Sequence, residues 1–517
     1  MGIVNTSIRS RLVESVKASI LIRPAIIAIS LCSSVIVARL LGPELMAIKV
    51  AFLAASTGLV VVCDFGLSRS LGKILPDISV KRGSLAANEI GRRIYHLKLV
   101  TTLCGFLVVV IAESTGMTDF TGTLSLKAAF FVLLFLRLLV SIPVQQLQSV
   151  GQAAFRAREL YRLELLISFL TPAAVITSVF IYRNPYAVII AGIIPQCLYL
   201  WLLSRSIRYD LDDEHVTEDK PVSIRTTLDE YKSYVLMTYT IFLFNRFVIR
   251  IPLLFAVLSL LGQPPAVLSN AAIAVMLVSQ AWALTNLPIA GMRAPLLTRM
   301  YAQENEKRFL DAQRTLLTIV LLTSSILIIV IATIGEPLLL SLYGLDYASG
   351  IKWGVIASAV ALFGNCLCMG NSTLHQRGCF APELWGIAGA VVFLSGGIVF
   401  CVSYLPEHDW AFGVLLVLVL GRIIFWSITD IWAETQVLKW QGSSIKLTAL
   451  TAVMLSIFVT RLIVGEDSSL VTSAIGCFVA LLFFWGIFRV LGGVGTRSRE
   501  ILATLLPARH RWVVCVV

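Results

Sequence analysis

The sequence predicts an all-α, polytopic membrane protein with about 14 transmembrane helices. Three observations support that class. Of the 517 residues, 57% are hydrophobic and only 14% are charged. The mean hydropathy is +0.87. Apolar segments of about 17–25 residues, the length that a helix needs to cross a bilayer, recur along most of the chain. A soluble enzyme with a single apolar core would not combine these features.

Hydropathy places the spans on either side of one long polar segment. The first six are predicted near residues 18–38, 47–64, 97–112, 128–149, 163–182 and 186–204. The next six are predicted near 235–260, 266–290, 315–335, 352–372, 384–403 and 412–433, and the last two near 447–464 and 468–488. The segments between them are predicted to be loops.

Charge is distributed unevenly among these loops. Most of the 42 Lys and Arg residues lie in alternate loops and near the two ends of the chain. By the positive-inside rule, these segments and both termini are predicted to be cytoplasmic. The net charge of +12 therefore orients the chain and contacts anionic membrane lipids, and nucleic acid is not a predicted partner.

The polar segment divides the chain into two predicted lobes. The sequence contains a short internal similarity at an offset of 220 residues, between Leu41-Gly42-Pro43 and Leu261-Gly262-Gln263-Pro264. Because six spans separate the two runs, they predict parallel repeats about an axis along the membrane normal. The expected parts are a cytoplasmic N-terminus over 1–17, an N-lobe over 18–204, an inter-lobe loop over 205–234, a C-lobe over 235–433, two further spans within 434–488 and a basic cytoplasmic tail over 489–517.

Arg246 and Arg250 are the most informative candidate site residues, because they lie in the middle of the apolar stretch 235–260. A guanidinium at membrane depth costs at least several kcal/mol unless it faces a polar cavity, a partner or a ligand. Their i,i+4 spacing places both on one face of a helix. This cationic face predicts an anionic substrate, and the alternative interpretation is a structural ion pair.

Further polar residues within the predicted spans are candidates for the same cavity. Their alternatives are snorkelling to the membrane surface for Arg23 and hydrogen bonds between helices for the amides. The cationic candidates that join Arg246 and Arg250 are Arg23, Arg137 and Lys49, and the secondary candidates are Asn245, Gln280, Asn286, Asn365 and Arg422.

The sequence contains no signature of catalytic or metal-binding chemistry. Its ten Cys residues are scattered without a CxxC pair, and neither a P-loop nor a nucleophile elbow is present. No cofactor, metal site or enzymatic activity is predicted. Carboxylates such as Asp64 and Asp430 lie near the ends of predicted spans, so none is predicted to bind a coupling ion at mid-membrane. Coupling to H⁺ or Na⁺ is left open.

Several runs resemble a known family. The run from Ala38 to Glu44 (ARLLGPE), followed by the run from Asp64 to Leu71 (DFGLSRSL), resembles the opening of bacterial polysaccharide flippases. These are the O-antigen and exopolysaccharide translocases of the multidrug/oligosaccharidyl-lipid/polysaccharide (MOP) exporter superfamily. Pro295-Leu296-Leu297 and Tyr343-Gly344 are similar to elements of that family's second half. Leu45-Met46-Ala47 departs from it, because the family commonly has an aromatic–glycine pair there.

The resemblance implies a V-shaped pair of helix bundles whose central cavity opens alternately to the two sides of the bacterial cytoplasmic (inner) membrane. The implied substrate is an undecaprenyl-pyrophosphate-linked oligosaccharide, and the implied protein partners are a polymerase and other polysaccharide-assembly proteins. A cation-coupled multidrug exporter of the same superfamily is the first alternative. A membrane polysaccharide polymerase or ligase is the second, although the predicted outer loops are too short to carry a catalytic domain.

Overall fold

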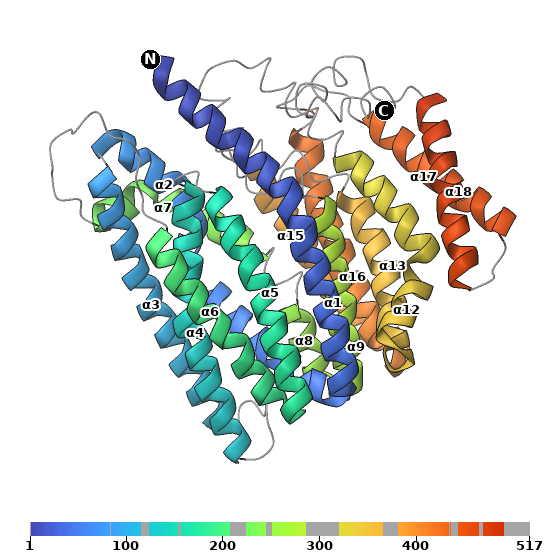
Figure 1. Ribbon diagram of the computed structural model, residues 1–517, viewed down its shortest axis with the longest axis horizontal. Coiled ribbons are helices and arrows are strands. Elements are labelled where there is room, and N and C mark those ends of the chain that lie inside the picture. The colour runs from blue at the N-terminus through green and yellow to red at the C-terminus, as the bar shows by residue number, and fades with distance from the viewer. Residues whose placement is uncertain are drawn as a thin grey trace. The chain divides into compact units, whose positions relative to one another are not determined.

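The computed structural model confirms the all-α class over the residues that it describes (Figure 1). Within that part of the chain, 11 helices are long and apolar enough to cross a membrane. The described residues are 2–82, 84–114, 124–153, 157–206, 224–244, 251–285, 320–365, 381–433, 435, 443–464 and 469–490.

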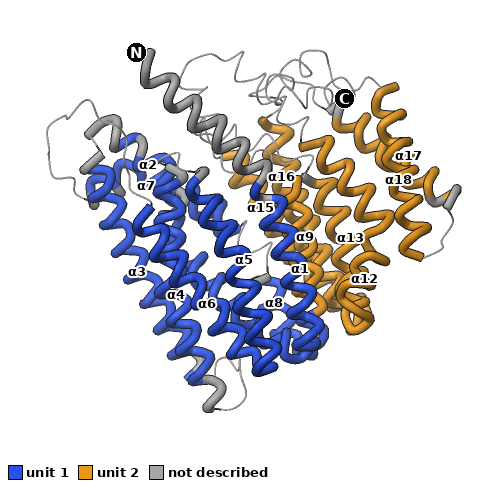
Figure 2. The backbone as a smooth tube through the Cα atoms, in the orientation of Figure 1, with its two compact units in different colours: residues 1–269 blue, residues 270–517 orange. Residues whose placement is uncertain are grey.

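The chain folds as two compact units, residues 1–269 and residues 270–517 (Figure 2). In the first unit, α5 packs against α1 and α6, and α2 packs against α3 and α4. An apolar cluster around Phe52, Phe130 and Ile142 joins α1 to α4. The helices of this unit are α1 (Gly2–Cys63), α2 (Leu67–Arg82), α3 (Ser84–Ser114), α4 (Leu124–Ala153), α5 (Ala157–Tyr182), α6 (Pro185–Ser206), α7 (Ile224–Leu243) and α8 (Ile251–Leu260).

The second unit is built in the same way from helix pairs. There α15 packs against α16, α13 packs against α16, and α17 packs against α18. Buried Leu362, Val453 and Phe484 belong to one apolar cluster that joins α13, α17 and α18. The helices are α9 (Pro265–Thr285, which begins in the first unit), a helix at 320–330, η2 (Ile331–Gly335), α12 (Glu336–Tyr343), η3 (Leu345–Tyr347), α13 (Ala348–Asn365), α15 (Ala381–Tyr404), η4 (Glu407–Asp409), α16 (Trp410–Trp432), α17 (Ser443–Val464) and α18 (Leu470–Val490).

The long helix α1 is long enough for two membrane crossings. Its apolar part, Pro24–Cys63, has 40 residues. A continuous helix of that length would measure about 60 Å, twice the thickness of the hydrocarbon layer. The backbone leaves helical geometry at Gly42, where φ is 73° and ψ is 171°. Pro43, which has no amide hydrogen, follows directly, so the run Leu41-Gly42-Pro43 separates two crossings as the sequence predicts.

The turn between α8 and α9 has a related backbone. Gly262 has a φ of 68°, and the Gln263 amide donates to the Leu258 carbonyl at 3.1 Å. This contact closes the end of α8, and Pro265 begins α9. A glycine with positive φ, followed closely by proline, thus occurs in both of the similar sequence runs.

One predicted loop is instead helical. Residues 65–96 were expected to connect two spans, but they contain α2 and the first part of α3. The α2 helix buries Leu67, Leu71 and Ile74, which repeat at helical spacing, while Gly72 and Lys73 are exposed. A hydropathy window averages these two faces and misses an amphipathic helix. The crossing in α3 therefore also begins earlier than predicted, at Ala86.

The turn between α1 and α2 is packed tightly against α7. Phe65 and Gly66 have φ values of 47° and 72°. The Tyr239 ring lies 5.4 Å from the Phe65 ring, and its hydroxyl donates to the Val62 carbonyl at 2.8 Å. A Cβ atom on Gly66 would lie 2.8 Å from the Tyr239 backbone. We call Asp64, Phe65, Gly66 and Tyr239 the joint.

Gly66→Ala is therefore expected to destabilise the protein by about 2–4 kcal/mol, because it adds both left-handed backbone strain and a steric overlap. Thermal unfolding of the purified protein in detergent would measure this change. Gly72→Ala is the matched control, since nothing lies within 4 Å of the added carbon. This helical, exposed position should become slightly more stable. Equal stabilities for the two variants would contradict the described packing of the joint.

Candidate functional site

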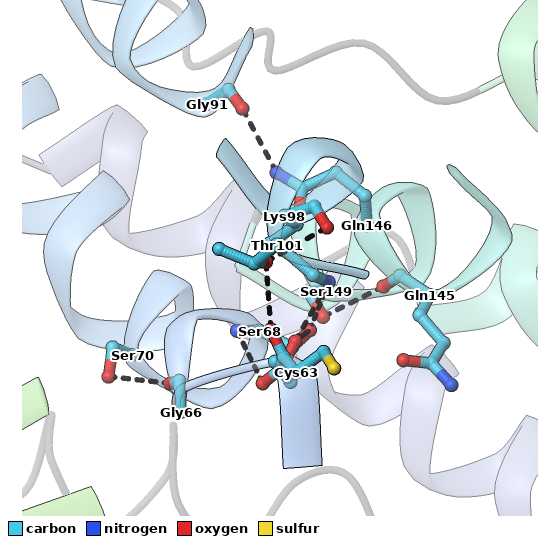
Figure 3. A network of polar contacts seen from close by, with 11 residues as sticks. Cys63, Gly66, Ser68, Ser70, Gly91, Lys98, Thr101, Gln145, Gln146 and Ser149 are labelled. Atoms are coloured by element: carbon cyan, nitrogen blue, oxygen red, sulfur yellow. Dashed lines mark hydrogen bonds and ion pairs between the residues drawn. The ribbon is translucent and has the colours of Figure 1, made fainter. Parts of the chain in front are cut away.

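A buried ion pair connects the joint to α3. The Lys98 ammonium lies 3.0 Å from an Asp64 carboxylate oxygen, and the two side chains are 2% and 1% exposed. Asp64 follows the last residue of α1, whereas Lys98 lies in the middle of α3. Figure 3 shows Lys98 directed into the polar network around Ser68.

Ser68 bridges the two charges. Its hydroxyl accepts a hydrogen bond from the Lys98 ammonium and donates one to the Asp64 carboxylate. The backbone amide of Ser68 donates to the other Asp64 oxygen at 3.2 Å. Asp64 therefore satisfies an otherwise unpaired amide in the first turn of α2, as an N-terminal capping residue does.

Further hydrogen bonds attach α3 to its neighbours. The Thr101 hydroxyl donates to the Cys63 carbonyl at 2.9 Å, so α3 contacts the end of α1 one turn beyond Lys98. The Gln146 side chain of α4 donates to the Gly91 carbonyl of α3 at 3.1 Å. These contacts fix the position of Lys98 relative to Asp64.

The charges of the pair cancel, which suits an apolar environment. Desolvating a charge costs several kcal/mol, and a close partner with additional hydrogen bonds offsets that cost. Removing one partner would leave the other charge buried and uncompensated. The pair is therefore an electrostatic unit whose two members depend on each other.

The second unit contains another buried lysine–aspartate ion pair. The Lys446 ammonium of α17 contacts the Asp430 carboxylate of α16, and the side chains are 7% and 3% exposed. Asp430 lies in the last turn of its helix and Lys446 in the first turn of the next. This pair links the end of α16 to the start of α17, whereas the Asp64–Lys98 pair links the turn between α1 and α2 to α3.

Several predicted site residues lie outside the described residues. Arg246, Arg250, Asn245 and Asn286 are among these. Arg23 belongs to α1 and Asn365 to α13, but their side chains also lie outside the described part of the structure. The predicted span 235–260 is described as α7 and α8, which flank the segment with the two arginines.

Two other cationic candidates lie in the first unit. Lys49 on α1 and Arg137 on α4 are both partly buried. Their helices pack together through Phe52 and Phe130, whose ring centroids are 5.5 Å apart. Two glutamines further along α4 bond to other helices: Gln146 donates to the Gly91 carbonyl of α3, and the Gln148 amide donates to the Tyr199 hydroxyl of α6 at 3.1 Å.

The remaining candidates, Gln280 and Arg422, lie in the second unit and are partly buried. The Arg422 guanidinium carbon is 3.2 Å from the centre of the Trp282 ring and 5.8 Å from that of Trp426. The Trp282 indole donates to the Ala361 carbonyl at 3.2 Å. Two aromatic faces thus stabilise the Arg422 charge through cation–π contacts.

Metal ligation has no geometric support in the part of the chain that the structure describes. No three His, Cys, Asp or Glu side chains come together there in an arrangement that could hold a metal ion.

Comparison with known proteins identifies the fold. The sequence matches no protein-family model and no curated protein. Solved structures of MATE transporters do match. An aspartate-to-asparagine variant of VcmN from Vibrio cholerae aligns with a TM-score of 0.54 and 14% identity over 84% of this chain and 99% of that one. Eukaryotic AtDTX14 aligns with a TM-score of 0.54 and 14% identity over 83% and 99% of the two chains, and an inward-facing multidrug resistance MATE family transporter of the MOP superfamily with a TM-score of 0.52 and 15% identity over 81% and 99%. The chain has the MATE transporter fold.

Sequence reasoning missed the ion pair on this fold. The sequence places Asp64 at the end of a predicted span, and Lys98 is not among the candidate site residues. The available signal was charge within an apolar context: Lys98 lies within Ala86–Ile111, a candidate span, and Asp64 directly follows another. Two opposite charges next to successive spans could have suggested a pair, although only the fold brings them together.

Lys98→Met is expected to destabilise the protein by about 3–5 kcal/mol, because it leaves the Asp64 carboxylate buried without its counter-ion. Asp64→Asn/Lys98→Met removes both charges and should regain much of that stability. Thermal unfolding in detergent would measure both variants. Lys73→Met is the control, since Lys73 is exposed and contacts the Tyr234 ring at 4.3 Å. A double variant no more stable than Lys98→Met would contradict the mutual dependence of the pair.

Proposed function

We propose that the protein is a membrane exporter of the MOP superfamily that moves a lipid-linked oligosaccharide across the bacterial cytoplasmic membrane by alternating access. The MATE fold supports the exporter. The observation that carries the substrate class is the pair Arg246 and Arg250, two cations four residues apart in an apolar stretch, a spacing that would form a cationic stripe on one face of a helix. A transporter with such a stripe is suited to an anionic substrate.

The chemistry of an undecaprenyl-pyrophosphate-linked oligosaccharide agrees with that stripe. A sugar-pyrophosphate headgroup cannot cross about 30 Å of hydrocarbon unaided. Arginine keeps its charge and forms bidentate hydrogen bonds to phosphate oxygens, so it can replace part of the water that the headgroup loses. In the proposal, Arg246 and Arg250 bind the pyrophosphate, and the isoprenoid tail remains in the bilayer.

The other candidates have supporting roles in this proposal. Arg23, Arg137 and Lys49 add positive charge along the path, and Arg422 adds it in the second unit. Asn245, Gln280, Asn286 and Asn365 offer amide groups that can hydrogen-bond to sugars. Transport requires no covalent step, so these residues bind and release rather than catalyse.

A cation-coupled multidrug exporter is the second candidate, and the match to a multidrug resistance MATE family transporter favours it. Cationic drugs would need an acidic surface. The buried Asp64 and Asp430 carboxylates are instead each matched by a lysine. This neutralisation favours an anionic substrate over a cationic one. A polymerase or ligase is less consistent with a transporter fold.

Depletion of the protein is expected to trap intact undecaprenyl-pyrophosphate-linked oligosaccharide on the cytoplasmic face. A membrane-impermeant glycan reagent, applied to intact and to permeabilised cells, would locate the trapped units. Units that reach the outer face but remain unpolymerised would indicate a polymerase or ligase. Unchanged lipid-linked intermediates would favour the multidrug exporter.

Arg246→Ala/Arg250→Ala is expected to abolish this transport while membrane insertion and protein level are unchanged, because the pyrophosphate loses both cations. Lysine at the two positions should restore transport only in part, since an ammonium cannot form the bidentate contact. Arg497→Ala/Arg499→Ala removes the same charge from the polar tail and is the matched control. Normal export by a stable Arg246→Ala/Arg250→Ala variant would overturn the proposed site.

A further inference from the structure

Helices α5 and α6 form an antiparallel hairpin in which Arg162 and Arg205 lie at the same level. The two helices pack against each other and are joined by residues 183–184 (Figure 1). A Cβ atom on Gly192 would lie 3.8 Å from a methyl carbon of Val175, which fixes the register. Arg162 precedes Val175 by 13 residues, and Arg205 follows Gly192 by 13 residues. Because the helices run in opposite directions, both arginines lie at the same end of the hairpin, about 20 Å from that contact.

This level is a boundary of the hydrocarbon layer. The two candidate spans are Glu159–Tyr182 and Pro185–Ser206, so each arginine lies close to one end of a span. A helix from Arg162 to Tyr182 measures about 30 Å, which is the thickness of that layer. Both arginines are exposed in the first unit, and no carboxylate in the described part of the chain forms an ion pair with either. The hairpin thus presents two cations at one edge of the membrane, the edge that the charge distribution predicts to be cytoplasmic.

Trp201 orders one of these cations. The Arg205 guanidinium carbon lies 4.2 Å from the centre of the Trp201 ring, and the tryptophan is 49% exposed. A cation–π contact orders the side chain without cancelling its charge, so the guanidinium hydrogens remain available to an anion. Tryptophan is typical of the level of the lipid headgroups, because its ring is apolar and its N–H group is polar. Trp201 and Arg205 therefore form a cationic, amphipathic surface at that level.

An exposed apolar face leads from this pair into the membrane. Ile190, Ile194 and Leu198 are exposed, and together with Trp201 and Arg205 they recur every three or four residues along α6. The distance along the helix from Arg205 to Ile194 is about 16 Å, half the thickness of the hydrocarbon layer. The face therefore has the length of an acyl chain in one leaflet, and its cation lies where the phosphate of a lipid lies.

The neighbouring helix has a similar face. On α5, Leu166 and Phe169 are exposed and follow Arg162 by four and seven residues, so the three side chains share one face of the helix. Arg162 therefore adds a second positive charge at the depth of Arg205, and exposed apolar side chains follow each arginine toward the middle of the membrane.

We propose that Trp201 and Arg205, with Arg162 at the same depth, bind an anionic phospholipid of the leaflet predicted to be cytoplasmic. The guanidinium groups donate hydrogen bonds to the lipid phosphate, the indole contacts the glycerol region, and an acyl chain lies along Ile194 and Leu198. Charge selects the occupant, because phosphatidylglycerol is a net anion whereas phosphatidylcholine carries a cation that the arginines repel. A soluble anion would make no use of the apolar face. The site does not rest on the proposed transport function.

Lipid binding can be measured by native mass spectrometry of the full-length protein, delipidated in detergent and titrated with phosphatidylglycerol or with phosphatidylcholine. Wild type is expected to bind one phosphatidylglycerol more tightly than any further lipid, and to prefer it to phosphatidylcholine. A cation near an anionic lipid increases affinity about five-fold, so Arg162→Ala/Arg205→Ala is expected to weaken the first binding step about 25-fold. Arg162→Lys/Arg205→Lys keeps both charges and should retain most of the affinity.

Arg92→Ala/Lys232→Ala is the matched control, because it removes two exposed cations from α3 and α7 of the same unit. This variant should bind the first phosphatidylglycerol as wild type does. Trp201→Leu keeps both arginines but removes the cation–π contact, so it should weaken the first binding step about two- to five-fold. Thermal unfolding identifies any destabilised variant. If the double alanine variant is destabilised, Trp201→Leu and the lysine variant carry the test.

Equal affinity of wild type for the two phospholipids would overturn the proposal. An equal loss in the two double alanine variants would also overturn it, because it would indicate diffuse surface charge and not a site. Tighter binding of undecaprenyl phosphate than of phosphatidylglycerol, lost in Arg162→Ala/Arg205→Ala, would make an isoprenoid phosphate the occupant in place of a phospholipid. Loss of the first phosphatidylglycerol that is confined to the Arg162, Arg205 and Trp201 variants would support the proposed site.

Discussion

The hydrocarbon layer does not tolerate an uncompensated charge, and the first unit is organised around this constraint. Asp64 and Lys98 compensate each other, and Ser68 provides the hydrogen bonds that complete the pair. The same carboxylate accepts the Ser68 amide in the first turn of α2. One residue therefore sets where α2 begins and which part of α3 lies beside it. Apolar packing around Leu71 and Ile90 adds stability between the same two helices.

The joint places the turn that carries Asp64 in direct contact with α7. Because a Cβ on Gly66 would overlap Tyr239, the turn and α7 are in close contact and cannot move far apart without losing packing. Tyr231, further back on α7, belongs to the apolar cluster of α2 and α3 and donates to Asp77. Two separate contacts thus hold α7 to the first unit. The helix α7, which precedes the Arg246–Arg250 segment in the sequence, is consequently packed against both the turn after α1 and the apolar cluster of α2 and α3.

Much of the fold could be predicted from the sequence, because hydrophobic length and the positions of glycine and proline are local properties. The turn at Gly42-Pro43 and most spans are where hydropathy places them. The helical α2 was missed because amphipathic residues average to a polar value. The pairing of Asp64 with Lys98 was missed for another reason: contact between residues 34 positions apart depends on how α1 and α3 pack, which no local pattern encodes. For the site itself, the sequence indicates the charge of Arg246 and Arg250 but not what surrounds it.

The glycine turn within α1 also limits what a protease or an antibody can reach. At Gly42 the chain passes from one apolar helix to the next through a single non-helical residue, and Pro43 already belongs to the second helix. A protease needs several residues of extended chain to cleave, and this turn does not provide them. An antibody would find only a small surface there, formed by exposed helical residues such as Arg39 and Glu44 beside the partly buried Gly42 and Pro43. Whichever side of the membrane the turn faces, it is therefore expected to resist added proteases.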